Sequence, residues 1–414
     1  MTPLHAASWK PWLRPLLRAA RTILRKAGEM AGRVQGASIV AEQAARGAPT
    51  LSAPNQPTFA HGRWVKIGGD GMGWEGDQFY KVRGLVCHRG EVFASITGPR
   101  QDGTRGEIWS LAGGQWRRIG GPGVAGWPRV EFIDQLAMHE EKLFAGTTGR
   151  LLCYSDGRWA DAAKRLPVRG EAGPYAFAST PNGLALSFWG DPAVAMFDGS
   201  RCIRLPDPRG GWGAGVRTVY SLALFEGQIY AGTGTGSMSG PSAQVYRFDG
   251  KSWELVGGGG VRGSWSQRGI PFVLRLCAFS NQLIATLSRP RNTPSGASNV
   301  WCFDRHEWRP IAVRRTPALM ARSLIMNDAI VYGGQLIVAT GDASHRQCRL
   351  WALDGDQRWR DVSGAVFEGG PSRHPGGMWI YVLATDGSSL FAGTAGHQGS
   401  ARVFRYAPAS FEPE

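Results

Sequence analysis

Several features that would place this sequence in a common functional class are missing. Its 414 residues contain no Gly-x-Ser-x-Gly, no His-Glu-x-x-His and no phosphate-cradling Gly-x4-Gly-Lys-Ser/Thr pattern, so the familiar hydrolase, metalloprotease and nucleotide-binding motifs are not there. No apolar run reaches the roughly 18 residues of a membrane-spanning helix. Arginines interrupt the N-terminal stretch every three or four residues, so we expect no secretory signal.

Cysteines and charged residues are also few. The six cysteines (Cys87, Cys153, Cys202, Cys277, Cys302, Cys348) form no Cys-x-x-Cys metal pattern, and most lie in apolar runs. We interpret them as free thiols, which favours a reducing, cytoplasmic location. Charged residues make up 19% of the chain, yet its net charge is +15, which favours anionic partners. Among anionic partners, nucleic acid is the least expected, because no run of basic and aromatic residues has the spacing of a known nucleic-acid-binding motif.

Glycine and tryptophan, in contrast, are abundant, with 59 and 17 residues, and they recur in a repeated pattern. The stretch "QIYAGTGTG" (228–236) resembles "EVFASITG" (91–98), "KLFAGTTG" (142–149) and "SLFAGTAG" (389–396). Seven copies occur at intervals of 41 to 54 residues, and their aligned positions are Ala94, Ala145, Leu186, Ala231, Ala285, Ala339 and Ala392. Repeats of this length that contain only strands and turns predict an all-β, seven-bladed β-propeller.

Each repeat is expected to form four antiparallel strands, with an Asp-Gly type I′ turn between the third and the fourth. Such turns are predicted at Asp156, Asp198, Asp249 and Asp354 with their following glycines, and a tryptophan heads the fourth strand of most repeats. The last repeat has no such strand, whereas "WVKIGG" (64–69) stands alone before the first repeat. We therefore expect this N-terminal strand to complete the seventh blade and close the ring.

The Tyr/Phe-x-x-Asp-Gly turn followed by tryptophan resembles the kelch-type and galactose-oxidase-like propellers over residues 62–408. One departure is that kelch repeats carry Gly-Gly after the second strand, where this chain has Ala-Gly-Thr or a variant. Galactose oxidase binds copper through tyrosine and histidine. That ligand motif has no residue-by-residue match here, so the resemblance implies a fold and assigns no catalytic residue.

The predicted domains are a basic helical arm (1–44), a Pro/Ala/Ser linker (45–61) and the propeller (62–414). Residues 8–34 have the apolar spacing of an amphipathic N-terminal helix, with arginines beside the apolar stripe. Such a helix can lie on an anionic membrane surface, dock on a partner or cover the face of the propeller that carries the short turns between strands, and the sequence leaves all three open.

The candidate ligand site lies on one face. In a four-stranded meander, the loops between the second and third strands share a face with the linkers between blades; we call it the long-loop face and the opposite one the short-turn face. The linkers on the long-loop face contain tryptophans and arginines, which are Trp74, Trp127, Trp212, Trp265, Trp379, Arg129, Arg217, Arg268, Arg322 and Arg373. Indoles stack on sugars and guanidinium groups bind carboxylate or sulfate. The alternative is that these tryptophans fill gaps between blades.

We therefore predict a non-catalytic binding propeller that recognises an anionic glycan or an acidic protein segment and needs no cofactor. The alternative is a polysaccharide-processing or metal-dependent enzyme that uses the same face. His345, His374 and His397 fall on neighbouring loops of that face, with Asp342 close to the first, and this set could hold a transition metal. A third possibility is a pure scaffold.

Overall fold

The computed structural model describes residues 62–407 except for 76–78, 99–105, 129–131, 169, 236–241, 266–269, 289–298, 312–316, 318–319, 321–324, 342–347, 355–356, 365–366, 368–378 and 397–399. The predicted helical arm and its linker therefore lie outside the described residues. In the described part, no helix has the length and apolar character needed to cross a membrane.

The described chain is all-β and folds into four-stranded antiparallel units. The first unit consists of β2 (Lys81–His88), β3 (Glu91–Thr97), β4 (Gly106–Ala112) and β5 (Gln115–Gly120). The second consists of β6 (Ile133–His139), β7 (Lys142–Thr147), β8 (Arg150–Ser155) and β9 (Arg158–Asp161). The third consists of β10 (Pro174–Thr180), β11 (Gly183–Phe188), β12 (Asp191–Phe197) and β13 (Cys202–Arg204).

The later units follow the same order. The fourth consists of β14 (Thr218–Phe225), β15 (Gln228–Gly234), β16 (Gln244–Phe248) and β17 (Trp253–Gly258). The fifth consists of β18 (Val273–Phe279), β19 (Gln282–Leu287), β20 (Val300–Phe303) and β21 (Trp308–Pro310). The sixth consists of β22 (Ile325–Tyr332), β23 (Gln335–Gly341), β24 (Cys348–Leu353) and β25 (Trp359–Asp361). The last combines β26 (Trp379–Thr385), β27 (Leu390–Ala395) and β28 (Val403–Ala407) with β1 (Arg63–Gly68).

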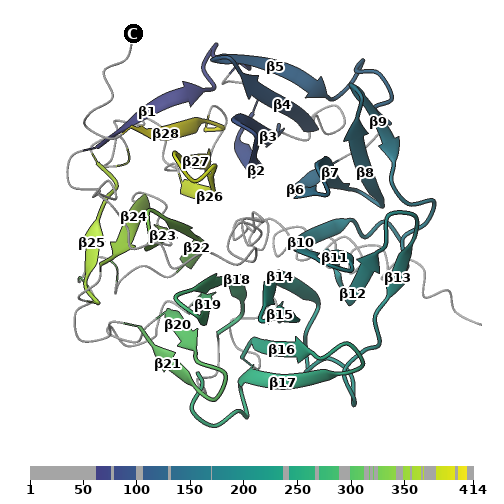
Figure 1. Cartoon of the computed structure of the whole chain (residues 1–414), viewed down its shortest axis with the longest axis vertical. Coiled ribbons are helices and arrows are strands. Elements are labelled where there is room, and N and C mark those ends of the chain that lie inside the picture. Colours follow the sequence, from purple (N-terminus) through teal and green to yellow (C-terminus); the bar gives the residue numbers. More distant parts are fainter. Residues whose placement is uncertain are drawn as a thin grey trace, which may run out of the picture.

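The units stand around a central axis, with the first strand of each nearest the centre and the fourth at the periphery (Figure 1). Five units are separate sheets, whereas the last and the first join into one eight-stranded sheet through the pair Lys81–Ala395. Linkers of 12 to 17 residues lead from each fourth strand to the next inner strand. This arrangement is a β-propeller.

The ends of the described chain meet in one sheet. Strand β1 pairs with β28 in antiparallel register, Trp64 opposite Tyr406 and Gly68 opposite Val403. The prediction that the N-terminal strand pairs beside residues 403–406 is therefore confirmed. The pairing supplies the last unit with the fourth strand that its own repeat does not contain.

The repeated Ala-Gly-Thr step has a steric reason. A Cβ added to Gly146 would lie 2.2 Å from the carbonyl oxygen of Pro174 in the next unit, and one added to Gly232 would lie 2.6 Å from Val273. A Cβ added to Gly393 would lie 2.7 Å from Val82 of the first unit. Adjacent units approach closely here, and a side chain would force them apart.

The threonine of the step connects the second and third strands. The Thr233 hydroxyl donates to the carbonyl oxygen of Gln244 at 3.0 Å and accepts the amide of the same residue at 2.9 Å. Thr394 makes the equivalent pair of bonds with Arg402. These bonds hold the entry of the third strand where the loop between the strands ends.

The tryptophans that head the fourth strands are wedges between units. The indole nitrogens of Trp64, Trp159 and Trp308 donate to the carbonyl oxygens of Val362, Ile119 and Val256, each in the preceding unit, at 3.0, 2.6 and 2.9 Å. Trp116 makes the same bond to Ile67, and the third unit has Cys202 at this place. These contacts give the tryptophans at the heads of the fourth strands a structural role between units.

The prediction of type I′ turns was right at Asp156-Gly157, where both φ angles are positive, but wrong at Asp198 and Asp249. There the aspartate carboxylate accepts backbone amides two and three residues further on, for example those of Lys251 and Ser252 at 2.8 and 2.7 Å. Paired positive φ angles occur instead between first and second strands, as at Arg89-Gly90 and Glu226-Gly227. Aspartate therefore acts mainly through its side chain in these turns.

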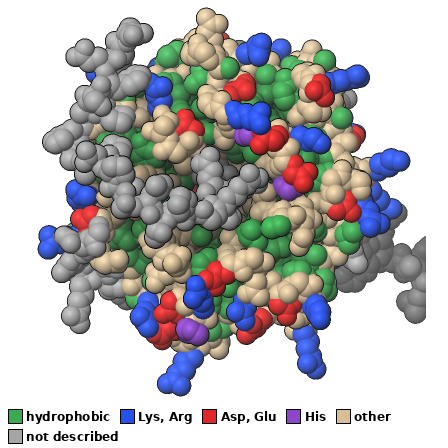
Figure 2. Space-filling view, viewed as in Figure 1, with side chains coloured by type: hydrophobic (Ala, Val, Ile, Leu, Met, Phe, Trp, Pro, Cys, Tyr) green, Lys and Arg blue, Asp and Glu red, His purple; other side chains and the backbone are tan. Residues whose placement is uncertain are grey.

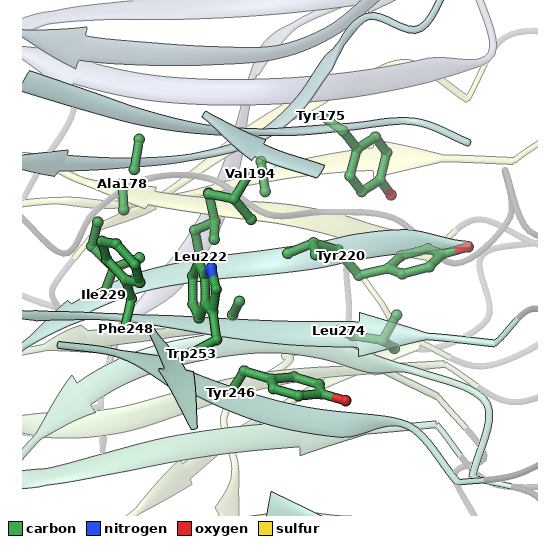
Figure 3. Packing of buried hydrophobic residues seen from close by; sticks show 14 of the residues in the cluster. Tyr175, Ala178, Val194, Tyr220, Leu222, Ile229, Tyr246, Phe248, Trp253 and Leu274 are labelled. Atoms are coloured by element: carbon green, nitrogen blue, oxygen red, sulfur yellow. The ribbon is translucent and has the colours of Figure 1, made fainter. Parts of the chain in front are cut away.

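Apolar side chains fill the space between neighbouring units. Figure 3 shows the cluster between the third and fourth units, where Val194, Leu222 and Phe248 lie beside Trp253. Tyr175, Tyr220 and Tyr246 point their hydroxyl groups toward the same side of this layer. The core is thus divided into layers between sheets, and in this layer three tyrosine rings lie toward one side.

Candidate functional site

Two of the predicted ligand-binding tryptophans are buried. The side chains of Trp74 and Trp265 are each 2% exposed, and their indole nitrogens donate to Ala401 and Ala243 at 2.8 and 2.9 Å. Each ring packs edge-on against the wedge tryptophan of the following unit, Trp116 or Trp308, at 5.0 Å between centroids. These two rings fill gaps between units and present no free face to a ligand.

Trp127 and Trp212 occupy equivalent linker positions but are half-buried. Trp127 lies 5.1 Å from Trp159 at 88°, and Trp212 lies 5.4 Å from Trp253. The indole nitrogen of Trp212 donates to Asp207 at 3.2 Å. Part of each ring is therefore accessible while its orientation is fixed.

Trp379 does not belong to this linker series. It begins β26 and is 9% exposed. The residue that packs edge-on against the wedge Trp64 is Phe367, at 5.3 Å and 71°. The sequence analysis looked only for tryptophan in the linkers, so it did not recognise that Phe367 takes the place of a linker tryptophan here.

Among the predicted arginines, Arg217 is exposed, and its backbone amide donates to Gly234 at 3.1 Å. The others, Arg129, Arg268, Arg322 and Arg373, lie outside the described residues. His345, His374, His397 and Asp342 lie outside them as well, so the proposed metal set is not tested. The described residues contain no other group of histidine, cysteine or carboxylate side chains that could hold a metal ion.

The structure adds arginines that the sequence analysis did not single out. Arg209 shares a linker with Arg217, and Arg262 lies in the next linker along the chain. All three side chains are exposed, and none forms an ion pair with another described residue. Most exposed arginines elsewhere face a carboxylate, as Arg150 faces Asp161 at 2.8 Å. In Figure 2, Lys and Arg side chains gather mainly along the rim of the visible face, often beside acidic ones.

Half-exposed Trp189 lies in the loop between β11 and β12, on the same long-loop face. Its ring is 5.3 Å from Tyr175 and 6.0 Å from Tyr220, at the inner ends of the third and fourth units. Trp189 and Trp212 both pack against the apolar cluster between the third and fourth units, and part of each indole is accessible. We call Trp189, Trp212, Arg209, Arg217 and Arg262 the Trp/Arg surface.

A second polar group surrounds the axis. In every unit, the pairing of the first two strands shifts register within the first four residues of the inner strand. The residues left without a partner at these bulges are Arg83, Asp134, Tyr175 with Ala176, Tyr220, Leu274, Asn327 and Tyr381. Bulges re-aim side chains, and here Arg83, Asp134, Tyr220 and Tyr381 all interact electrostatically with Tyr175, so side chains from five of these bulges lie near one another.

Several of these residues interact. Arg83 forms an ion pair with Asp134 of the next unit, and the Lys81 ammonium lies 4.0 Å above the ring of Tyr381. Burial, followed by the charge of Arg83, lowers the pKa of Lys81 well below its usual value. Burial raises the pKa of Tyr175 and Tyr381 well above the usual tyrosine value. We call Lys81, Arg83, Asp134, Tyr175, Tyr220 and Tyr381 the axial cluster.

Perturbed pKa values favour functional sites, but structural ion pairs produce them too. All six residues of the axial cluster are nearly buried, Lys81 at 3% exposure and Tyr381 at 0%. The arrangement therefore holds the inner strands together in the described structure. The indication available in the sequence was a lysine, an arginine and an aspartate inside otherwise apolar strands, "KVRGLVCH" and "IDQLAMH".

A buried ion pair joins the last three units. Arg275 of β18 contacts Asp328 of β22 at 3.2 Å, and Asp328 also accepts the amides of Ala329 and Leu383 at 2.9 and 2.8 Å. Burial raises the pKa of Asp328 to about 7, while Arg275 and the two amides oppose that shift. Because N–H donors occupy both carboxylate oxygens, we interpret Asp328 as a structural residue that links neighbouring units.

No protein family and no curated protein sequence matches this chain. A Trypanosoma rangeli sialidase in complex with the inhibitor DANA is 10% identical, with a TM-score of 0.45 over 80% of this chain and 54% of that one. The extracellular domain of a B. thetaiotaomicron one-component system is 14% identical, with a TM-score of 0.37 over 77% and 46%. The WD40 β-propeller domain of Doa1 is 10% identical, with a TM-score of 0.47 over 79% and 93%.

This chain thus spans about half the length of the first two proteins. At these identities, neither the sialidase name nor the other titles assign an activity or a partner to it. The propeller assignment rests on the sheets themselves, and membership of the kelch group stays a prediction.

Proposed function

We propose that the chain is a seven-bladed propeller, with the eight-stranded sheet counted as two blades, and that its Trp/Arg surface binds an anionic glycan. The observation that supports this most directly is the set Arg209, Arg217 and Arg262, three exposed guanidinium groups without an ion-pair partner in the described chain. They lie in the linkers on either side of the fourth unit. A positively charged band of this kind suits an extended ligand with several negative charges.

The indoles give the proposal its preference for sugars. The ring contacts of Trp212 with Tyr246 and Trp253, at 5.0 and 5.4 Å between centroids, fix the ring before a ligand arrives. Tyr175 and Tyr220 hold Trp189 in the same way. Rigid aromatic rings lose little conformational freedom on binding, and their faces match the apolar face of a sugar ring. Guanidinium groups beside them would bind carboxylate or sulfate substituents.

Residues 8–34 would tether this propeller to an anionic membrane surface. The support for the tether is the amphipathic, arginine-rich spacing of that segment in the sequence. It is independent of the glycan proposal, because no residue of the Trp/Arg surface belongs to it.

A binding experiment tests the glycan proposal. Wild type and the triple variant R209Q/R217Q/R262Q are titrated against an immobilised sulfated glycan, a carboxylated glycan and a neutral glycan. Exposed ion pairs contribute about 0.2–1 kcal/mol each, so losing three should weaken anionic glycan binding by roughly 3- to 150-fold. A second variant, W189L/W212L, should weaken the same interaction while keeping the charge unchanged.

The matched control removes the same charge from the opposite side. Lys142, Lys251 and Arg358 are exposed and lie in or beside turns of the short-turn face. The variant K142Q/K251Q/R358Q should bind glycan within twofold of wild type. Equal losses in the two triple variants would mean that net charge alone attracts the ligand, and the proposal would be rejected. Loss in the arginine variant without loss in W189L/W212L would favour an acidic protein segment instead.

A further inference from the structure

The third unit departs from the repeat at the place where the others carry a wedge tryptophan. Its fourth strand, β13, has three residues and begins with Cys202. Tryptophans head the corresponding strands as Trp64, Trp116, Trp159, Trp253, Trp308 and Trp359. A thiol fills far less space than an indole, so this position is expected to be underfilled.

A pocket lies beside Cys202. It has a volume of about 400 Å³ and is lined by Arg165, Leu166, Pro167, Val168, Cys202 and Arg204. Leu166 is buried, and Pro167, Val168 and Cys202 are half-buried. The pocket is therefore an open hollow with an apolar floor and two guanidinium groups. Its volume is in the range of sites that accept one large side chain or a small ligand.

The backbone beside the pocket can accept another strand. Leu205 donates to Val194 at 2.9 Å, Asp198 donates to Arg201 at 3.2 Å, and Ile203 stands opposite Met196. In an antiparallel pair, hydrogen-bonded positions alternate, so the backbone groups of Cys202 and Arg204 point away from β12. Strand β13 is the peripheral strand of its unit (Figure 1), and Ile203 on it is 45% exposed.

The charges around this edge favour an acidic partner. Asp207 and Asp191 face Arg204 at 3.0 and 3.7 Å, and Asp198 faces Arg201 at 3.1 Å. The carboxylates of these elements are thus already paired. In contrast, Lys164 and Arg165 are exposed and form no ion pair within the described chain. Two positive charges next to the pocket are left for a ligand.

We propose that the outer edge of the third unit binds an extended acidic peptide, which adds a strand to β13 and inserts one aromatic side chain into the pocket. Main-chain hydrogen bonds to Cys202 and Arg204 would set the peptide's direction and register. The aromatic ring would take the place that the wedge indole occupies in other units. Carboxylates on either side of it would face Lys164 and Arg165.

The test uses fluorescent five-residue peptides with blocked ends and the full-length protein. One peptide carries phenylalanine between two pairs of glutamates, a second has alanine in place of phenylalanine, and a third has lysines in place of the glutamates. Fluorescence anisotropy should show that the first binds at least tenfold more tightly than either of the others. The variant C202W, which restores the repeat residue, should weaken binding of the first peptide at least tenfold by filling the pocket.

A second variant keeps the test independent of how C202W folds. K164E/R165E changes two exposed side chains and should weaken the first peptide at least tenfold, whereas R209Q/R217Q/R262Q should leave its affinity within twofold of wild type. Equal binding of the phenylalanine and alanine peptides would overturn the proposal. So would unchanged affinity in K164E/R165E, or unchanged affinity in a C202W protein that melts at or above the wild-type temperature.

Discussion

The close approach of neighbouring units can be tested at one atom. In Gly146→Ala, the new Cβ would lie 2.2 Å from the Pro174 carbonyl oxygen and 3.0 Å from its carbonyl carbon. Ordinary Cβ contacts begin near 3.4 Å, so the second and third units must separate by about 1 Å at this point. The obstacle is backbone in β10, which cannot rotate away as a side chain could. Gly146 does not have a positive φ angle, so the effect would be steric and not torsional.

The cost can be worked out from these distances. Overfilled cores lose about 1–3 kcal/mol, and a backbone obstacle places this substitution near 3 kcal/mol. A propeller of about 350 residues unfolds with an entropy of roughly 0.7 kcal/mol per kelvin, so its melting temperature should fall by about 4 °C. Differential scanning calorimetry of the purified protein measures this shift directly.

Gly341→Ala is the matched control. Gly341 is also in the second strand of its unit, but its new Cβ would meet Asn327 Nδ2 at 3.5 Å, an ordinary contact. Because alanine restricts the unfolded chain more than glycine, this variant should be unchanged or gain about 0.5–1 kcal/mol. If both variants melt at the same temperature, contact between units does not explain the glycine in the repeat.

Two further predictions concern the wedges and the turns. Trp159→Phe removes the indole bond to Ile119 and should cost about 1–3 kcal/mol in urea unfolding. Trp253→Phe should cost less, because the Trp253 nitrogen has no hydrogen-bond partner among the described residues. Backbone amides lower the pKa of Asp198, Asp249 and Asp304 from the ordinary value of 3.8. Their stabilisation is therefore complete above pH 4 and is lost as pH falls through the lowered values. The variant D198N/D249N/D304N should thus lose less melting temperature than wild type between pH 5 and pH 2, and an identical loss would contradict the assignment.

The fold was largely predictable because its evidence is local and repeated. Period-two apolar runs identify strands, and repeating them at 41 to 54 residues identifies the units. The isolated strand at Trp64 and the incomplete last repeat predicted the β1–β28 pair, since each supplies what the other needs. Turn geometry was less predictable. An Asp-Gly dipeptide fits either a type I′ turn or a side-chain cap, and the loop length decides between them.

The site was less predictable because burial depends on the neighbouring unit. Trp74 and Trp127 look alike in sequence, yet Trp74 is buried and Trp127 is half-exposed. Phe367 replaces a linker tryptophan without any change that the composition would reveal. The Arg83–Asp134 pair joins residues 51 positions apart, and it forms because both inner strands shift register at the same level. The apolar pattern of a strand does not reveal where its pairing with the next strand shifts register.

Repetition also makes individual departures informative. When most units place an indole between sheets, the stability of the ring no longer depends on a single unit, and one unit can carry a smaller residue. Cys202 is that residue, and the pocket lies beside it, lined in part by the linker that carries Lys164 and Arg165. The Trp/Arg surface has the same origin, because Trp212 keeps its contact with the wedge Trp253 while part of its ring stays accessible. In this propeller, the candidate binding positions are therefore the places where one unit lacks, or only partly forms, the aromatic packing that other units share.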